Sequence, residues 1–87
     1  MQYILDIMQY ISYTAQMEKI QFENNLKLAR VAINLSQAEL ADAVGVTRQT
    51  IGLIEAGKYN PTIKLCLALA QVTNKTLNEL FWIKGER

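Results

Sequence analysis

The segment 36–55, which reads SQAELADAVGVTRQTIGLIE, contains two short helix signals separated by a single glycine. Ser36 precedes the first signal and a glutamate follows three positions later, a spacing that predicts a capping box. Gly45 closes this helix, because glycine adopts a positive φ without steric cost. Thr47 caps a second helix, which we expect to end before Gly57. The segment therefore predicts two short helices joined by a tight turn.

Three further helices are expected around this pair, because cap residues and apolar positions recur at helical spacing. Five helices with no long loop between them predict an all-α fold, and 87 residues suit one domain. The first is expected from about Asn25 to Ile33, with Asn24 or Asn25 as its cap and Asn34 in the left-handed turn that ends it. The second is expected from near Ile63 to Asn74. The third is expected from Leu77 to about Phe81, after a capping box formed by Thr76 and Glu79.

Apolar side chains at helical spacing define the expected core. They are Leu40, Ala41 and Val44 in the first helix of the pair, and Ile51 and Ile54 in the second. The inward face of the helix that begins near Ile63 is predicted to comprise Ile63, Leu65, Cys66, Leu69, Ala70 and Val72.

The two ends of the domain leave alternatives open. Residues 19–24 alternate apolar and polar side chains, and residues 81–85 begin with aromatic and β-branched ones. They form either a short two-stranded antiparallel ribbon or two extended tails. Residues 1–18 are an apolar extension before the domain at 19–87, with Ile4, Ile7, Met8 and Ile11 at helical spacing. This extension is an artefact of expression or start-site choice, a helix packed on the domain or on a second subunit, or a disordered segment.

Composition argues against several classes of protein. The chain has one cysteine, Cys66, and no histidine, so a disulfide within the chain is excluded and a metal site or Cys–His nucleophile lacks its usual partners. There is no glycine-rich phosphate loop and no carboxylate pair with a reason to share a site. We therefore expect neither an enzyme nor a cofactor. No segment has the roughly 20 apolar residues of a membrane-spanning helix, and no Lys or Arg precedes residue 19, so a secretory signal is not expected.

Charge is modest and uneven along the chain. The net charge is +1, which is too low to indicate a general binder of polyanions. Residues 24–66 hold five basic against three acidic side chains, a net +2, whereas residues 1–23 hold one basic against three acidic, a net −2. Any electrostatic attraction for nucleic acid is therefore local.

The start of the second helix of the pair presents Arg48, Gln49 and Thr50. Two short helices joined by a tight turn form a helix-turn-helix, whose second helix enters the major groove of DNA. Arg48 can donate to guanine O6 and N7, and Gln49 can pair with adenine N6 and N7. Thr50 can offer its hydroxyl to a phosphate or its methyl to thymine. Each residue taken alone is more often a solvated polar side chain, so the signal lies in their placement around the turn.

Contacts to the DNA backbone are expected on both sides of these residues. Phosphates bind well at helix amino ends, where backbone N–H groups are unpaired. The expected backbone contacts are Gln37, Thr47, Lys58, Tyr59 and Asn60.

The stretch from Asn25 to about Trp82 resembles the Cro/repressor-type helix-turn-helix family, also called the xenobiotic-response-element type. The resemblance implies a compact five-helix lambda-repressor-like DNA-binding domain, and the end of the chain is similar to small dimeric repressors such as the repressor of the cytolysin operon, which carry a short ribbon. It also implies a buried pair between Arg30 and Glu55. The matching motifs are Ser36-Gln37-x-Glu39-Leu40-Ala41, Val44-Gly45-Val46-Thr47-Arg48-Gln49-Thr50-Ile51, Ile54-Glu55-x-Gly57-Lys58-Tyr59-Asn60-Pro61 and Leu77-x-Glu79-Leu80-Phe81.

Some positions depart from the family pattern. Gly52 and Leu53 stand where relatives often carry polar side chains that read bases, so Gly52 either permits a closer approach to DNA or means fewer base contacts. Leu28 and Val31 are apolar where the family is often charged. Our hypothesis is that residues 1–18 cover this extra apolar surface.

The sequence as a whole predicts a sequence-specific, double-stranded DNA-binding transcriptional regulator. We expect a repressor that binds a palindromic operator as a homodimer, in the cytoplasm of a prokaryotic cell or from a phage, with no small-molecule ligand and no membrane partner. Two alternatives remain. One is an antitoxin-like module that binds a toxin and its own promoter, and the other is a protein-interaction domain that has lost DNA binding.

Overall fold

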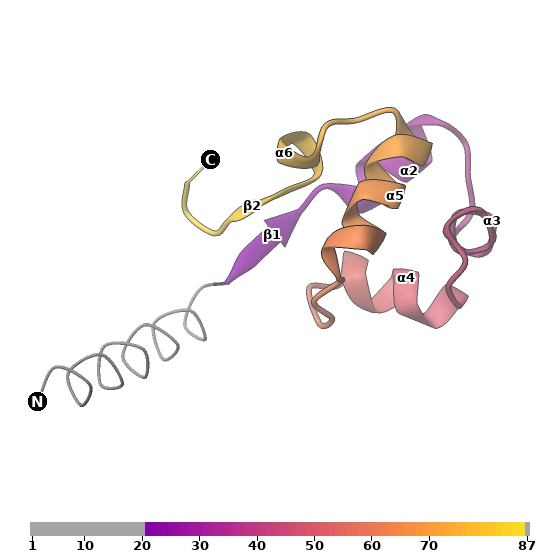
Figure 1. Ribbon diagram of the computed structural model, residues 1–87, viewed down its shortest axis with the longest axis horizontal. Helices are drawn as coiled ribbons and strands as arrows, with labels where there is room; N and C mark the ends of the chain where they lie inside the picture. Colours follow the sequence, from indigo (N-terminus) through magenta and orange to yellow (C-terminus); the bar gives the residue numbers. More distant parts are fainter. Residues whose placement is uncertain (1–20, 87) are drawn as a thin grey trace, which may run out of the picture.

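Five helices and two short strands follow one another between residues 21 and 86, the part of the chain that the computed structural model describes (Figure 1). The expected extension at residues 1–18 lies outside these residues. The order of the elements confirms the predicted helical fold, and of the two alternatives left open for the ends of the domain the structure has the ribbon. The elements are β1 (Phe22–Asn24), α2 (Leu26–Ala32), α3 (Gln37–Val44), α4 (Arg48–Glu55), α5 (Ile63–Thr73), α6 (Leu77–Leu80) and β2 (Phe81–Ile83).

Local signals set the helix ends as the sequence predicted. The Ser36 hydroxyl accepts from the Glu39 N–H at 3.0 Å, and the Glu39 carboxylate accepts from the Ser36 N–H at 2.9 Å. Gly45 ends α3 with φ of 78°. Asn34 and Asn74 take the left-handed conformation after α2 and α5, with φ of 60° and 57°. These turns are short, and they hold successive helices against one another.

Asn24 connects the ribbon to two helices. Its side-chain oxygen accepts from the Leu26 N–H at 3.1 Å, whereas Asn25, which stands at the cap position of α2, makes no side-chain capping bond. The Asn24 amide nitrogen also donates to the Ile54 carbonyl, 30 positions away, at 2.8 Å. One side chain thus fixes the start of α2 and the end of α4 relative to β1.

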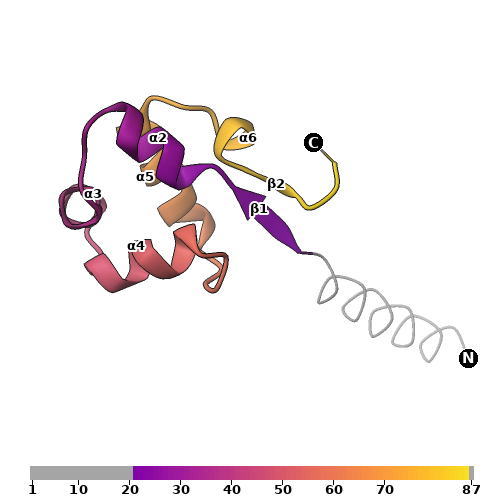
Figure 2. The same ribbon diagram turned by 180° about the vertical axis from the view of Figure 1, so that it is seen from behind.

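The ribbon pairs β1 with β2 antiparallel, with Phe22 opposite Ile83 and Asn24 opposite Phe81. It projects from the side of the domain away from α3, as both views show (Figures 1 and 2). The rings of Phe22 and Phe81 meet edge to face at a centroid distance of 6.0 Å. On the other face of the ribbon, the Trp82 indole N–H donates to the Glu23 carboxylate at 3.1 Å. The extended backbone at Phe81 also means that α6 ends at Leu80, one residue earlier than the sequence indicated.

A single apolar cluster lies between the helices. Its buried side chains are Leu26, Ala29, Leu40, Ala41, Ile51, Ile54, Leu69, Ala70 and Leu80.

Ile63 was wrongly assigned to this core, because its side chain is 68% exposed. The residue stands at the first position of α5, where the helix has only just begun and the domain does not yet cover its side chain.

Thr73, by contrast, is buried at the other end of α5. Its hydroxyl donates to the Leu69 carbonyl at 2.8 Å, which satisfies it without a partner from another element.

The solvent side of α2 is unusually apolar. Leu28 is 70% exposed and Val31 is 52% exposed. The segment that we expected to cover them, residues 1–18, lies outside the described residues, so this remains a hypothesis.

Candidate nucleic-acid interface

α4 lies along one edge of the domain, with α3 packed beside it (Figure 1). Ile51 and Ile54 attach α4 to the core, since both side chains are fully buried. Arg48 and Gln49, one helical turn earlier, are exposed. α4 is therefore packed on the core through these two side chains, while the two long polar side chains of its first turn face solvent. The exposure of Arg48 and Gln49 is compatible with the base contacts expected from the sequence.

Arg48 occupies a position that helix electrostatics disfavours. It is the first residue of α4, and the first turn of this helix contains no acidic residue. The amino end of a helix carries a partial positive charge, so a cation there is mildly destabilising. Within residues 21–86 the Arg48 side chain makes no ion pair or hydrogen bond that would offset this. A local conflict of this kind is typical of a functional position, and a polyanionic ligand would resolve it.

Thr47 and Thr50 hold the start of α4 together. The Thr47 hydroxyl accepts from the Thr50 N–H at 3.3 Å, and the two hydroxyls lie 2.9 Å apart. The Thr50 hydroxyl is therefore already engaged within the chain, and its remaining capacity toward DNA is smaller than that of Arg48 or Gln49. Thr47 is exposed and its role as a cap is established by this geometry.

The loop after α4 begins with a defined turn. The Gly57 N–H donates to the Ile54 carbonyl at 2.9 Å and the Lys58 N–H to the Leu53 carbonyl at 2.8 Å, which is the Schellman arrangement. Gly57 has a φ of 73°, which glycine adopts without strain. This turn fixes where Lys58 leaves the helix. Lys58 and the next two residues, Tyr59 and Asn60, are exposed.

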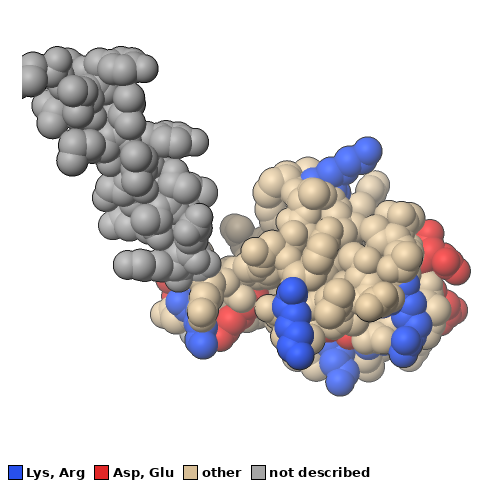
Figure 3. All heavy atoms as spheres, turned by 90° about the horizontal axis from the view of Figure 1, so that it is seen from below, with Lys and Arg blue, Asp and Glu red and all other residues tan. Residues whose placement is uncertain are grey.

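Seen from the side on which α4 lies, the domain carries separate basic side chains across its face, while most of the visible acidic ones lie toward its two opposite ends (Figure 3). This distribution fits a surface that meets an anionic ligand at several separate points. It agrees with the modest local charge of the sequence rather than with a dense basic patch.

A buried charge pair lies behind this surface. Arg30 Nε donates to Glu55 Oε2 at 2.7 Å, and Arg30 Nη2 donates to Glu55 Oε1 at 3.2 Å. Arg30 Nη1 donates to the Leu35 carbonyl at 2.8 Å. Both charged side chains are at most 10% exposed. The two-pronged contact ties α2, the loop before α3 and the end of α4 together.

The charge states of this pair follow from its contacts. Burial acts to raise the pKa of the Glu55 carboxyl, but hydrogen bonds from Arg30 and Gln37 and the nearby positive charges of Arg30 and Lys27 outweigh it and hold the pKa below its ordinary value. The hydrogen bond to Glu55 in turn raises the pKa of Arg30, against the opposing effect of burial. Both groups are therefore charged across the neutral range.

Gln37, which the sequence analysis assigned to a phosphate contact, also forms a hydrogen bond within the domain. Its side chain is half-buried, and Gln37 Nε2 donates to Glu55 Oε1 at 3.0 Å. The sequence offered no sign of this bond, because the two residues are 18 positions apart and glutamine at the start of a helix is usually solvated. The main-chain N–H groups of the first turn of α3 remain able to meet a phosphate.

Gly52 lies beneath the Gln37 side chain. A Cβ at this position would stand 3.7 Å from Gln37 Nε2 and 3.9 Å from Gln37 Oε1, which are ordinary van der Waals distances. Alanine is favoured over glycine inside a helix by about 1 kcal/mol. We therefore expect Gly52→Ala to raise the free energy of unfolding by roughly this amount, measured by urea denaturation. A loss of stability would show that the contact with Gln37 is tighter than the distances indicate.

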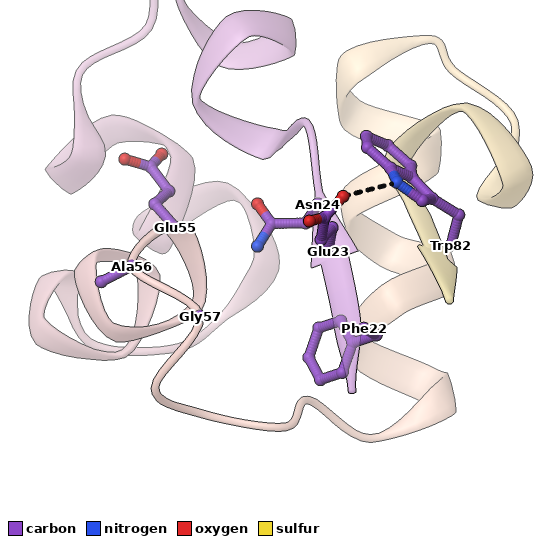
Figure 4. Close-up of a pocket in the computed structure, with 7 residues that line it drawn as sticks. All are labelled: Phe22, Glu23, Asn24, Glu55, Ala56, Gly57 and Trp82. Atoms are coloured by element: carbon purple, nitrogen blue, oxygen red, sulfur yellow. Dashed lines mark hydrogen bonds between the residues drawn. The ribbon is translucent and has the colours of Figure 1, made fainter. Parts of the chain in front are cut away.

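A shallow hollow of about 290 Å³ separates the end of α4 from the ribbon (Figure 4). Asn24 points across it toward α4, while the Glu55 side chain points away from the ribbon (Figure 4). Within residues 21–86, no group of three or more side chains is arranged to hold a metal ion, and no helix is long and apolar enough to cross a membrane. The residues that line the hollow come from the ribbon and from the end of α4 with the turn after it.

Comparisons with known proteins agree with this geometry. A helix-turn-helix family model matches residues 26–80. A transcriptional regulator of the helix-turn-helix type from Archaeoglobus fulgidus is 45% identical over 56 residues, covering 64% of this chain and 79% of the relative. The regulator YgzD of Bacillus subtilis is 36% identical over 64 residues, covering 74% and 97%. The crystal structure of the restriction-modification controller protein C.AhdI from Aeromonas hydrophila is similar with a TM-score of 0.59 and 33% identity, covering 62% of this chain and 82% of that one.

Proposed function

This chain belongs to the Cro/repressor-type helix-turn-helix family of DNA-binding transcription regulators, and we propose that it acts as a dimeric repressor of a palindromic operator. The observation that carries the proposal is the exposed first turn of α4, where Arg48 stands against the helix dipole and without a partner in the described chain. Its position favours an anionic ligand that also presents hydrogen-bond acceptors, and DNA offers both, through its phosphates and through guanine O6 and N7.

Base contacts are assigned to Arg48, Gln49 and Thr50, with Thr50 the weakest because its hydroxyl is engaged by Thr47. Contacts to phosphates are assigned to the other polar groups around α4. These are the first turn of α3 at Gln37, the cap Thr47, and the exposed loop residues Lys58, Tyr59 and Asn60.

The size of the reading surface supports a dimer. One eight-residue helix with two long exposed side chains contacts too few base pairs for useful specificity. Two copies related by a two-fold axis would place their half-sites about one helical turn, roughly 34 Å, apart. We place this activity in the cytoplasm of a prokaryotic cell, where such operators are accessible.

Selection of bound duplexes from a random pool at physiological salt tests the proposal. The expected result is a palindromic consensus whose half-sites are separated by about one turn of DNA. Enrichment of a non-palindromic site would contradict the dimer, and the absence of any enriched sequence would contradict sequence-specific binding.

Lys58→Ala should weaken binding to every duplex alike. Lys58 is exposed at a fixed turn beyond α4, so we assign it a phosphate contact. Each phosphate contact contributes about 0.9 to the slope of log affinity against log salt, and the variant should lower that slope by about one. Titration of one specific and one random duplex at several salt concentrations measures this. A loss confined to the specific duplex would assign Lys58 to base recognition instead.

A further inference from the structure

The Asn24 side chain joins the ribbon to the carboxyl end of α4. Its Nδ2 donates to the Ile54 carbonyl at 2.8 Å, and its Oδ1 accepts from the Leu26 N–H at 3.1 Å. A carbonyl only accepts and a main-chain N–H only donates, so the amide has a single possible orientation with both of its ends engaged. The sequence indicated Asn24 only as a candidate cap of the helix that follows it, which is half of what the side chain does.

The Ile54 carbonyl is also an acceptor within the turn that ends α4. The Gly57 N–H donates to the same oxygen at 2.9 Å. The last carbonyls of a helix have no partner within the helix, and a carbonyl oxygen has two lone pairs. Gly57 and Asn24 together therefore satisfy this oxygen, and one of its two bonds comes from the ribbon.

The amide reaches this turn across a hollow rather than through packed side chains. The hollow of about 290 Å³ is lined by the ribbon and by the end of α4 with its turn. Asn24 points across it toward α4, whereas the Glu55 side chain points away from the ribbon (Figure 4). Ile54 is buried, but the next residues of the turn, Ala56 and Gly57, are exposed. On this side the turn is therefore held by a hydrogen bond from the ribbon.

The loop residues that we assign to phosphates, Lys58, Tyr59 and Asn60, leave the domain directly after this turn. We propose that Asn24 is a positioning residue for DNA binding, whose amide holds the end of α4 so that Lys58 meets its phosphate. The inference rests on the proposed function, because the phosphate contact belongs to it. A fixed turn leaves less conformational entropy to be lost when the loop meets DNA. Asn24 itself acts through the loop, and the ribbon thereby supports the DNA-binding surface.

Asn24→Asp separates the two bonds of the amide. Aspartate caps the start of a helix as well as asparagine does, but a carboxylate cannot donate to the Ile54 carbonyl. The parent and the variant are titrated with the selected operator and with a random duplex at several salt concentrations. We expect the slope of log affinity against log salt to be lower by about 0.9 on both duplexes, with base preference unchanged. Between about 50 and 200 mM salt this changes the ratio of parental to variant affinity by about 3- to 4-fold.

Two further variants control for charge and for folding. Asn25→Asp makes the same chemical change one position later, where the side chain makes no capping bond, and it should keep the parental slope. Asn24→Ser adds no charge, and its hydroxyl can still cap α2 but is one atom shorter than the amide nitrogen. It should reproduce the lower slope, and it replaces the aspartate variant if that variant is unstable. Circular dichroism establishes that each variant is folded at the titration temperature.

Lys58 provides the test of mechanism, because it is the only cation in the loop 58–60. In the Lys58→Ala background, Asn24→Asp should lower the slope no further. A further fall would overturn the inference, because Asn24 would then act at another phosphate. A parental slope in Asn24→Asp and in Asn24→Ser would overturn it in favour of a purely structural bond to Ile54. If Lys58→Ala itself keeps the parental slope, the phosphate contact of the proposed function fails, and the inference fails with it.

Discussion

Replacing Glu55 with alanine is expected to lower the free energy of unfolding by roughly 3–5 kcal/mol. The change leaves the Arg30 guanidinium buried with only the Leu35 carbonyl as acceptor, and it removes the acceptor of Gln37 Nε2. A small domain is typically stable by only about 5–15 kcal/mol, so this is a large part of the whole. Urea denaturation followed by circular dichroism measures it. A loss below about 1 kcal/mol would show that Arg30 finds another partner or reaches solvent.

Two variants separate charge pairing from packing. Glu55→Gln keeps the shape and one acceptor oxygen but removes the charge, and its cost should lie between zero and that of Glu55→Ala. The double variant Arg30→Met/Glu55→Leu removes both charges and keeps apolar volume. Because buried pairs replaced in this way are often no less stable, it should recover most of the lost free energy. If it is as unstable as Glu55→Ala, packing rather than the unpaired charge explains the single variant.

Acid should remove the same contribution in the parent protein. The pKa of Glu55 is lower in the folded chain than its ordinary value of 4.5, so the unfolded chain binds this proton more readily. The stability that the pair contributes is then complete above about pH 4.5 and is lost as the pH falls through the folded-state pKa. Urea midpoints measured at about pH 7, 4 and 3 should decline in the parent and decline less in Glu55→Gln. Equal declines would assign the acid sensitivity to other carboxylates.

The helix ends were predictable because each depends on residues close in sequence. Ser36 with Glu39 and Thr47 with Thr50 act within three positions, and Gly45 acts through its own backbone. Such local patterns form the same caps and turns in almost any fold. The Arg30–Glu55 pair is 25 positions apart, and only the family resemblance indicated it.

The contacts that assemble the reading surface were less accessible to sequence analysis. The bond from Gln37 to Glu55 and that from Asn24 to the Ile54 carbonyl span 18 and 30 positions. Each depends on how the helices pack, and the sequence pattern around a polar side chain does not identify its hydrogen-bond partner. Ile63 shows the opposite error, since an apolar residue at helical spacing was placed inside although the helix end leaves it 68% exposed. Apolar spacing predicts which side of a helix faces the core, but the length of helix that is buried depends on how far the other elements extend over it.

Arg48→Ala and Gln49→Ala are each expected to weaken binding to the selected operator by about 1–3 kcal/mol, which corresponds to roughly 5- to 150-fold in affinity. Both side chains are exposed at the first turn of α4, so their removal should leave the urea midpoint almost unchanged. Arg48→Ala should not lower stability, because it removes a cation from the positive end of the helix dipole. Because each residue is assigned to a base edge, the variants should also accept other bases at one position per half-site, whereas Lys58→Ala should keep the parental preference. Competition titrations with single-base operator variants measure this difference. If Gln49→Ala bound the operator as tightly and as selectively as the parent, α4 would not be the element that reads the bases.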